Sequence, residues 1–214
     1  MNVLQAIRER RAVRDFKPEP VCAGMLHQLV SAASWAPSAM NEQPWLFTIV
    51  TDRTVLDDIS RRAKTWMLEN LPAMPRRAHF RDILADPDFH IFYNAPCLVV
   101  ISAASTGPWT NEDAALAAQN LMLMATDLGM GSCWIGFAQG WLNTTEGRQM
   151  LDLSENAHVV APIIVGHPRT VPPLVARKMP LVSWIGHRHI KGDEVIEAPE
   201  LAVVPRTHDT QLHP

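Results

Sequence analysis

Apolar residues recur along the chain at two spacings, one typical of helices and one typical of strands. The helical spacing predicts one helix over residues 22–35, a second over 54–70 and a third over 112–128. A shorter helix is expected around 145–153, and Asn2 is expected to cap a first helix at the start of the chain. The chain is therefore rich in helices that each present an apolar side.

Short apolar runs predict strands at 45–50, 97–102 and 158–165. The run 97–102 is apolar throughout, which is typical of a central strand covered on both faces. The helix 112–128 is apolar nearly all round, so we expect it to be enclosed in the core or at an interface between chains. Gly136 ends a further strand-like run and would let the backbone come close to a ligand.

A polar and aromatic stretch joins the helix 22–35 to the strand 45–50. Pro37 and Pro44 disfavour helix in the residues before them, so the chain is extended here. Its side chains could surround a planar ligand with a polar edge, or they could simply cap turns. The residues concerned are Trp35, Ser38, Asn41, Gln43 and Trp45.

Four arginines fall within seven residues near the N-terminus. Like charges this close repel each other unless an anion or carboxylates neutralise them. Arg10 and Arg14 would share a face if the first helix continued, and would converge from a helix end and a strand start if it stopped near Arg11. Either arrangement suits a phosphate, and a solvated turn paired with Glu9 and Asp15 is the alternative.

Composition indicates one globular domain. The chain has 214 residues, of which 47% are hydrophobic and 19% charged, with seven tryptophans and ten methionines. Low charge and many large apolar residues suggest that a partner chain covers part of the surface, although a generous core is the alternative. A net charge of −3 gives no reason to expect nucleic acid or a membrane as partner.

The three cysteines are odd in number and fall in apolar settings. Cys22, Cys97 and Cys133 are therefore predicted to be buried free thiols in a reducing, cytoplasmic compartment. Nothing has the spacing of a metal site, and His187 and His189 are read as part of a polar tail. No apolar run is long enough for a transmembrane helix, and no secretory leader is recognised at the N-terminus.

Several segments together resemble the nitroreductase family. The pair Arg10–Phe16 and Ala36–Trp45 resembles its signature, and later landmarks follow in order. The resemblance runs from about residue 2 to about residue 184. The later landmarks are Tyr93–Pro96, Leu128–Gly136, Pro162–Gly166 and Arg177–Pro180.

The resemblance implies an α+β fold with a central, mostly antiparallel sheet flanked by helices, in an intertwined homodimer. It implies non-covalent FMN at the subunit interface and ping-pong electron transfer from NADH or NADPH to a nitroaromatic, quinone or similar acceptor. FMN would carry the chemistry, so no catalytic side chain is expected. A single domain is expected over residues 1–184, with 185–214 as a tail that is extended or draped on the partner.

The resemblance also assigns residues to the cofactor. The arginine segment would contact phosphate, ribityl and ring, Ser38 and Asn41 would reach the flavin from the opposite subunit, and the backbone near Gly136 would face its N5 edge. Either Arg177 or Lys178 would contact the phosphate. The full set is Arg10, Arg11, Ala12, Arg14, Pro37, Ser38, Ala39, Asn41, Gln43, Trp134, Ile135, Gly136, Arg177 and Lys178.

Two positions depart from the family pattern. Ala12 replaces a common serine, and Ile135 stands where some members carry an acidic residue, which makes the local site more apolar. The segment 71–92 is expected to form loops or short helices over the flavin. The candidate wall residues, in this segment and in the helix before it, are Trp66, Met74, Phe80 and Phe89, each with core packing as the alternative.

Other functions of the same fold stay open. The alternatives are a specialised flavoenzyme, such as a flavin reductase, a reductive dehalogenase or a flavin-fragmenting enzyme, and a flavin-binding protein without turnover. Steady oxidation of NAD(P)H with nitroaromatics or quinones would separate the leading interpretation from these.

Overall fold

The computed structural model describes residues 1–70 and 78–181. One compact unit spans Met1–Pro172, and a second unit begins at Pro173. Within that second unit, residues 173–181 contain neither helix nor strand. The predicted tail from residue 185 and the wall candidate Met74 lie outside the described residues.

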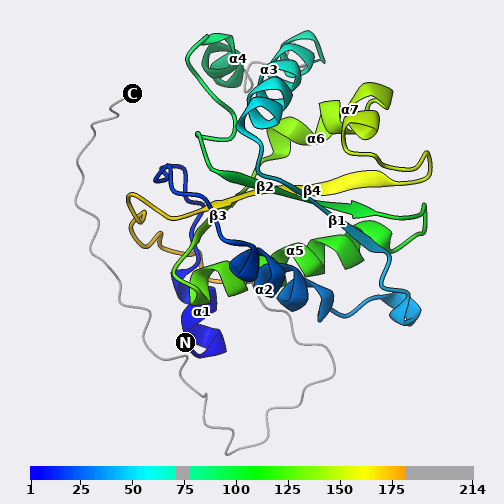
Figure 1. Cartoon of the computed structure of the whole chain (residues 1–214). Coiled ribbons are helices and arrows are strands. Elements are labelled where there is room, and N and C mark those ends of the chain that lie inside the picture. Colours follow the sequence, from blue (N-terminus) through cyan, green and yellow to red (C-terminus); the bar gives the residue numbers. More distant parts are fainter. Residues whose placement is uncertain (71–77, 182–214) are drawn as a thin grey trace, which may run out of the picture. The chain divides into compact units, whose positions relative to one another are not determined.

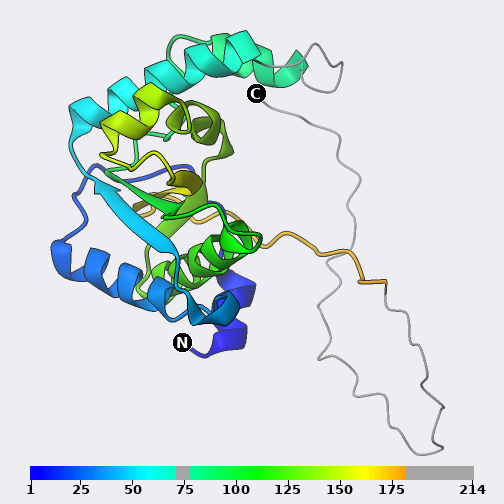
Figure 2. The same ribbon diagram turned by 90° about the vertical axis from the view of Figure 1, so that its right-hand side faces the viewer.

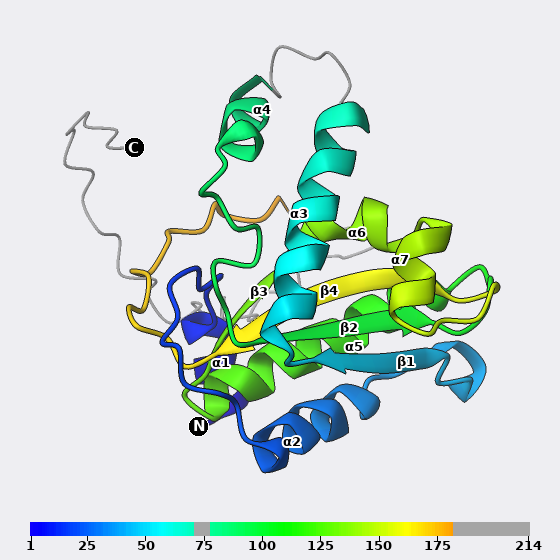
Figure 3. The ribbon, with the colours of Figure 1, turned by 45° about the horizontal axis from the view of Figure 1, so that its top comes forward.

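The compact unit is built on a four-stranded sheet (Figure 3). The strands are arranged in the order β1 (Trp45–Val50), β2 (Cys97–Ala103), β4 (His158–Gly166) and β3 (Gly131–Trp134). All three strand pairs are antiparallel. The sheet of the predicted fold class is confirmed, and the predicted strands match the observed ones to within one residue.

Helices cover both faces of this sheet (Figures 1 and 2). α2 (Ala23–Ser34) and α5 (Thr110–Asp127) lie on one face, and α3 (Arg53–Asn70) and α6 (Gly136–Leu142) lie on the other. The remaining helices are short. They are α1 (Val3–Glu9), η1 (Ala39–Asn41), α4 (Ala78–Ala85) and α7 (Thr145–Met150).

Side chains that point alternately to the two faces of the sheet divide the core into two layers. In β2, Leu98 and Val100 pack toward α3 and α6, while Val99 and Ile101 pack toward α2 and α5. Successive side chains of a strand point to opposite faces, so a strand buried on both sides must be apolar throughout. Every residue of β2 is buried, as its sequence predicts.

The nearly all-apolar helix α5 is buried on its core side, as predicted, but Leu116 on the same helix is 45% exposed. Its alanines Ala114, Ala117 and Ala118 are at most 1% exposed and pack in the same layer as α2. Gly129 ends the helix with φ = 70°, where an L-residue with a side chain would be strained. The Met130 and Gly129 N–H groups then donate to the Ala125 and Thr126 carbonyls, which closes the helix end.

One expectation needs correction, and one helix was missed. Cys97 and Cys133 are buried free thiols, but Cys22 is exposed, because it caps the start of α2 instead of lying on its apolar side. Burial raises the pKa of the Cys97 thiol to about 12. The strand-like run before Gly136 is strand β3, but helix α6, which begins at Gly136, was not predicted.

None of the helices within residues 1–70 and 78–181 combines the length and the hydropathy that a membrane span requires.

The close packing of α6 on α3 can be tested at Gly140. A Cβ atom there would lie 2.1 Å from the Trp66 ring, so Gly140→Ala forces the indole to move. We expect the free energy of unfolding to fall by about 1–3 kcal/mol, measured by urea denaturation. Gly24→Ala in α2 is the control, because a Cβ there meets nothing within 4 Å. Equal effects of the two substitutions would contradict this packing.

Candidate functional site

The arginine segment leaves the first helix and runs along the edge of the sheet. α1 ends at Glu9 with Arg10 as its C-cap. The Val13 N–H donates to the Ser132 carbonyl at 3.1 Å, and Ala12 forms a parallel bridge with Ser132. Of the two arrangements considered for the arginines, the structure has the second one, in which a helix end leads into an extended segment.

Arg11 folds back onto the end of α1. Its Nη1 donates to the Arg8 carbonyl at 2.5 Å and to the Arg10 carbonyl at 2.7 Å. A guanidinium at a helix C-terminus satisfies carbonyl groups that lack a helical partner and suits the helix dipole. This geometry gives Arg11 a capping role, while its predicted contact with a cofactor stays a prediction.

Arg14 reaches a cavity of about 280 Å³ at the junction of β3 and α6. Three of the predicted residues, Trp134, Ile135 and Gly136, line it together with Arg14. Gly136 opens helix α6, and a Cβ there would meet nothing within 4 Å, so this part of the backbone is accessible. Ile135 is only 4% exposed and belongs to the core.

Three further residues of this cavity were not predicted: Tyr93, Cys133 and Phe137. Tyr93 lies in the Tyr93–Pro96 landmark, so that motif was the available signal. The Arg14 Cζ atom lies 5.8 Å from the centroid of the Tyr93 ring, within the range of a cation–π contact. Cys133 likewise lies in the Leu128–Gly136 landmark, whereas Phe137 follows it and belongs to none of the motifs.

The arginines make this cavity electropositive. Burial raises the pKa of Cys133, and the charges of Arg14 and Arg10 act against that rise. Burial likewise raises the pKa of Tyr93, and Arg14 opposes it. Both arginines therefore act on groups that line the cavity, which favours a ligand carrying negative charge.

Two of the wall candidates are in contact with the cavity lining. Phe80 makes an edge-on contact with Phe137 at 5.7 Å between ring centroids, and Phe89 does the same with Tyr93 at 5.6 Å. Trp66 packs in the core between α3 and α6, so the core alternative holds for it.

The second predicted group lies at the other end of the sheet. Cys133 pairs with Ile164, Ile164 with Leu98, and Leu98 with Val50, whereas the stretch 37–43 precedes Trp45. Five residues of strand separate Trp45 from Val50, which corresponds to about 17 Å. One chain therefore does not bring Pro37, Ser38, Ala39, Asn41 and Gln43 to the cavity that Arg14 lines.

The turn at residues 38–43 has an unusual backbone. Met40, Asn41 and Gln43 have φ values of 53°, 56° and 50°, in the left-handed region that residues with side chains rarely adopt. The Gln43 N–H donates to Ser38 Oγ at 3.0 Å, and Gln43 Nε2 donates to Asn41 Oδ1 at 3.1 Å. Strain of this kind persists where surrounding contacts hold it and is common at binding sites.

A buried carboxylate anchors this turn to α5. Asp113 is 4% exposed, and its Oδ1 accepts the Ala39 N–H at 3.0 Å. The Ala104 N–H donates to the Pro44 carbonyl at 2.7 Å and fixes the other end. The position of the turn is thus set by tertiary contacts.

A larger cavity of about 670 Å³ lies between the segment 16–23 and the start of α3. It contains two arginines, but Arg53 is paired with Asp57 and Arg169 with Asp15. None of the predicted cofactor residues lines it. The smaller, electropositive cavity is therefore the better candidate site.

Comparison with known proteins decides the family. The family model described as the nitroreductase family matches residues 7–167.

The chain belongs to the nitroreductase family.

The proteins that it resembles carry several different names. The iodotyrosine deiodinase of Thermotoga neapolitana is 31% identical over 133 residues, which cover 58% of this chain and 68% of that protein. The FMN reductase (NAD(P)H) of Bacillus subtilis is 27% identical over 174 residues, covering 78% of this chain and 66% of that protein. The crystal structure of a nitroreductase from Bacteroides fragilis with bound FMN superposes with a TM-score of 0.72 at 28% identity, covering 88% of this chain and all of that chain.

These comparisons confirm the family and the fold class predicted for this nitroreductase-family chain. Arg177 and Lys178 lie in the second unit, and their contact with a phosphate stays a prediction. The roles of the other predicted cofactor residues also stay predictions.

The hydrogen bond that anchors the turn at residues 38–43 to Asp113 can be tested by mutation. We expect Asp113→Ala to lower the free energy of unfolding by about 1–3 kcal/mol, because the Ala39 N–H loses a charged acceptor. The amide of Ala39 should also exchange hydrogen faster, as measured by NMR or mass spectrometry. Glu112→Ala removes an exposed acidic residue from the same helix turn and should leave this amide unchanged. Unaltered exchange in Asp113→Ala would show that the carboxylate does not hold the turn.

Proposed function

We propose that this protein is an FMN-dependent oxidoreductase that passes electrons from NADH or NADPH to nitroaromatic, quinone or similar organic acceptors. The observation that carries the proposal is the junction of the arginine segment with β3. It sets Arg14 beside a cavity that Trp134, Ile135 and Gly136 also line. Relatives named as FMN reductase and nitroreductase, one of them with bound FMN, support the cofactor.

The residues of the site fit a flat, phosphorylated ring. Arg10 and Arg14 supply positive charge for phosphate and for an electron-rich ring, since guanidinium forms charge-assisted hydrogen bonds with both. Gly136 offers accessible backbone, while Tyr93 and Phe137 offer aromatic surface that excludes water. When bound, FMN supplies the two-electron chemistry, so the side chains need only bind, orient and polarise.

One chain provides only part of such a site. Its cavity of about 280 Å³ is below the ~300–1,000 Å³ typical of ligand pockets. The turn carrying Ser38 and Asn41 is about 17 Å away along the sheet, and its residues 40–43 are exposed. Trp35 before the turn and Met40 within it are 83% and 90% exposed, which is unusual for large apolar residues. A homodimer in which each subunit's turn completes the partner's cavity accounts for these features.

A reductive dehalogenase is the second candidate. The deiodinase of Thermotoga neapolitana matches this chain at higher identity than the FMN reductase does. The two candidates share the cofactor and differ in the acceptor. Turnover of a halogenated phenol in place of nitroaromatics and quinones would favour the dehalogenase.

The visible spectrum tests the proposed function directly. Purified protein should be yellow from bound FMN, and adding NADH or NADPH without oxygen should bleach it. A later addition of a nitroaromatic or quinone should restore the colour. Protein that stays colourless after incubation with excess FMN would refute the proposal.

Arg10→Ala should release the cofactor. Loss of a charge-assisted contact costs about 1.5–3 kcal/mol, so we expect FMN to bind about ten- to a hundredfold more weakly in a flavin fluorescence titration. Arg8→Ala is the matched control, because Arg8 is an exposed arginine of α1 with no predicted cofactor role. Full retention of FMN in Arg10→Ala would remove Arg10 from the site.

A further inference from the structure

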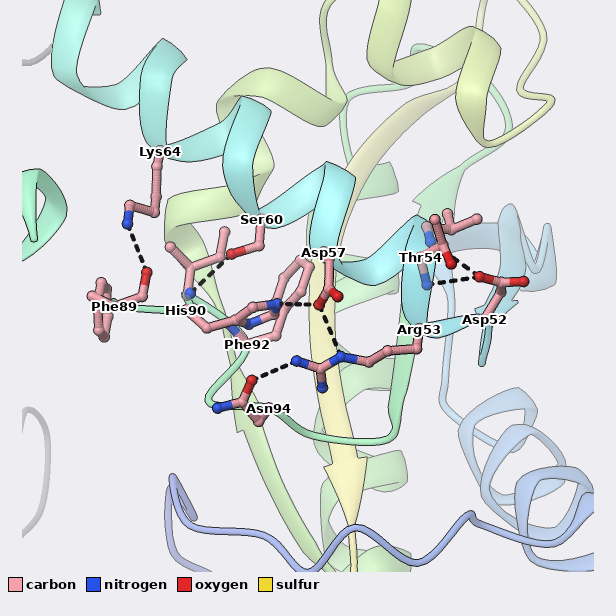
Figure 4. Close-up of polar contacts among 12 residues, drawn as sticks. Asp52, Arg53, Thr54, Asp57, Ser60, Lys64, Phe89, His90, Phe92 and Asn94 are labelled. Atoms are coloured by element: carbon pink, nitrogen blue, oxygen red, sulfur yellow. Dashed lines mark hydrogen bonds and ion pairs between the residues drawn. The ribbon is translucent and has the colours of Figure 1, made fainter. Parts of the chain in front are cut away.

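A stripe of polar side chains runs along one side of α3 (Figure 4). Arg53, Asp57, Ser60 and Lys64 follow one another at spacings of four, three and four residues, which places them on one face of the helix. We call these four residues the α3 stripe. Each of them contacts the segment 86–94, which precedes strand β2.

At the Lys64 end of the α3 stripe, the side chains bind backbone groups. Lys64 Nζ donates to the Asp86 carbonyl at 2.6 Å and to the Phe89 carbonyl at 2.7 Å. Ser60 is 2% exposed, and its Oγ accepts the Ile91 N–H at 3.1 Å. These contacts satisfy backbone groups of a segment that has no regular structure of its own, and the Ile91 N–H among them is buried.

At the Arg53 end of the α3 stripe, the side chains bind other side chains. Asp57 accepts from Arg53 Nε at 2.8 Å and lies 3.0 Å from His90 Nε2. Arg53 also donates to the Asn94 side-chain oxygen. The stripe therefore holds the segment at five residues from Asp86 to Asn94. Figure 4 shows its contacts with Phe89, His90 and Asn94.

The contacts of His90 select its neutral form. His90 Nδ1 accepts the Phe92 N–H at 3.2 Å, so this nitrogen carries no proton. Nε2 then carries the proton and donates to Asp57. A second proton on Nδ1 would face the Phe92 N–H, and two donors cannot share a hydrogen bond.

The segment held in this way ends beside the candidate site. Tyr93 and Asn94 have φ values of 51° and 55°, a strained conformation for a bulky aromatic residue. Tyr93 lines the cavity and is in cation–π range of Arg14. Release of the segment would let Tyr93 relax and leave Arg14 without this contact.

We propose that Asp57 and His90 are positioning residues of the cofactor site, and that neutral His90 keeps Tyr93 against Arg14 whereas protonated His90 frees residues 89–94. This inference rests on the proposed function. Neither Asp57 nor His90 lines the cavity, so both act through Tyr93.

The charges around His90 give the direction of the pH dependence. Burial lowers the pKa of His90 below its usual 6.5, Asp57 acts to raise it, and Arg53 and Lys64 act to lower it. A His whose pKa is lowered by folding favours the folded state while neutral. Its contribution is complete above pH 6.5 and is lost as the pH falls below that value.

The experiment measures the dissociation constant of FMN between pH 5 and 8 for the full-length protein and three variants. In His90→Asn the amide oxygen can accept the Phe92 N–H without titrating. We therefore expect wild-type affinity to fall about tenfold more than that of His90→Asn toward low pH. The ratio of the two constants at each pH cancels the titration of the FMN phosphate itself near pH 6.

Asp57→Asn and Asp58→Asn form a matched pair. Asp58 follows Asp57 on α3 but pairs with Arg61 and Arg62 of its own helix. Asp57→Asn should weaken FMN binding several-fold even at pH 8 and speed hydrogen exchange in residues 89–94. Asp58→Asn should do neither.

Two results would overturn the positioning role. One is a constant ratio between wild type and His90→Asn across the pH range, and the other is equal behaviour of Asp57→Asn and Asp58→Asn. Wild-type protein that binds no FMN at pH 8 would instead overturn the proposed function, and with it the role of the cavity as a cofactor site.

Discussion

The site depends on the backbone pairing of residues 12–17 with the sheet. The Val13 N–H bonds to Ser132, Phe16 bridges to Pro168, and the Lys17 N–H donates to the His167 carbonyl. These bonds add the arginine segment to the edge of the sheet beside β3. A Cβ at Gly131 would lie 2.8 Å from the Val13 side chain, so the close approach requires glycine. Without this pairing the arginines would be a charged, solvated turn.

The two groups of predicted cofactor residues belong to different ends of the same sheet. The register from Cys133 through Leu98 to Val50 defines one end, and the turn before Trp45 lies at the other. Backbone pairing with β3 positions the arginine segment, and a hydrogen bond to Asp113 positions the turn at residues 38–43. In the proposed dimer the protein would be a scaffold with two half-sites, the arginine segment and the turn at residues 38–43, and FMN would carry the chemistry.

Much of the fold could be predicted because strand and helix periods are clear in the core. β2 is apolar on both faces and fully buried, and α5, apolar nearly all round, is buried on its core side. α6 was missed because it has seven residues with glycines at 136 and 140, which is a weak helical signal. Cys22 was misjudged because a capping position and an apolar helix side cannot be told apart at a helix start from composition.

The site itself was predictable only as separate segments. Local motifs identify Arg14 and Gly136, but register and antiparallel pairing determine which of them share a cavity. The contribution of Tyr93 depends on the α3 stripe, whose contacts span up to 41 residues of sequence and leave no local pattern.

The separation of the half-sites has a genetic consequence. In the proposed dimer, every cofactor position combines the arginines of one chain with the turn of the other. A chain damaged in its arginines and a chain damaged in its turn would each be inactive as a pure dimer. Co-expressed, they would form mixed dimers in which one position collects both defects and the other is intact, so two null alleles of this protein would complement each other.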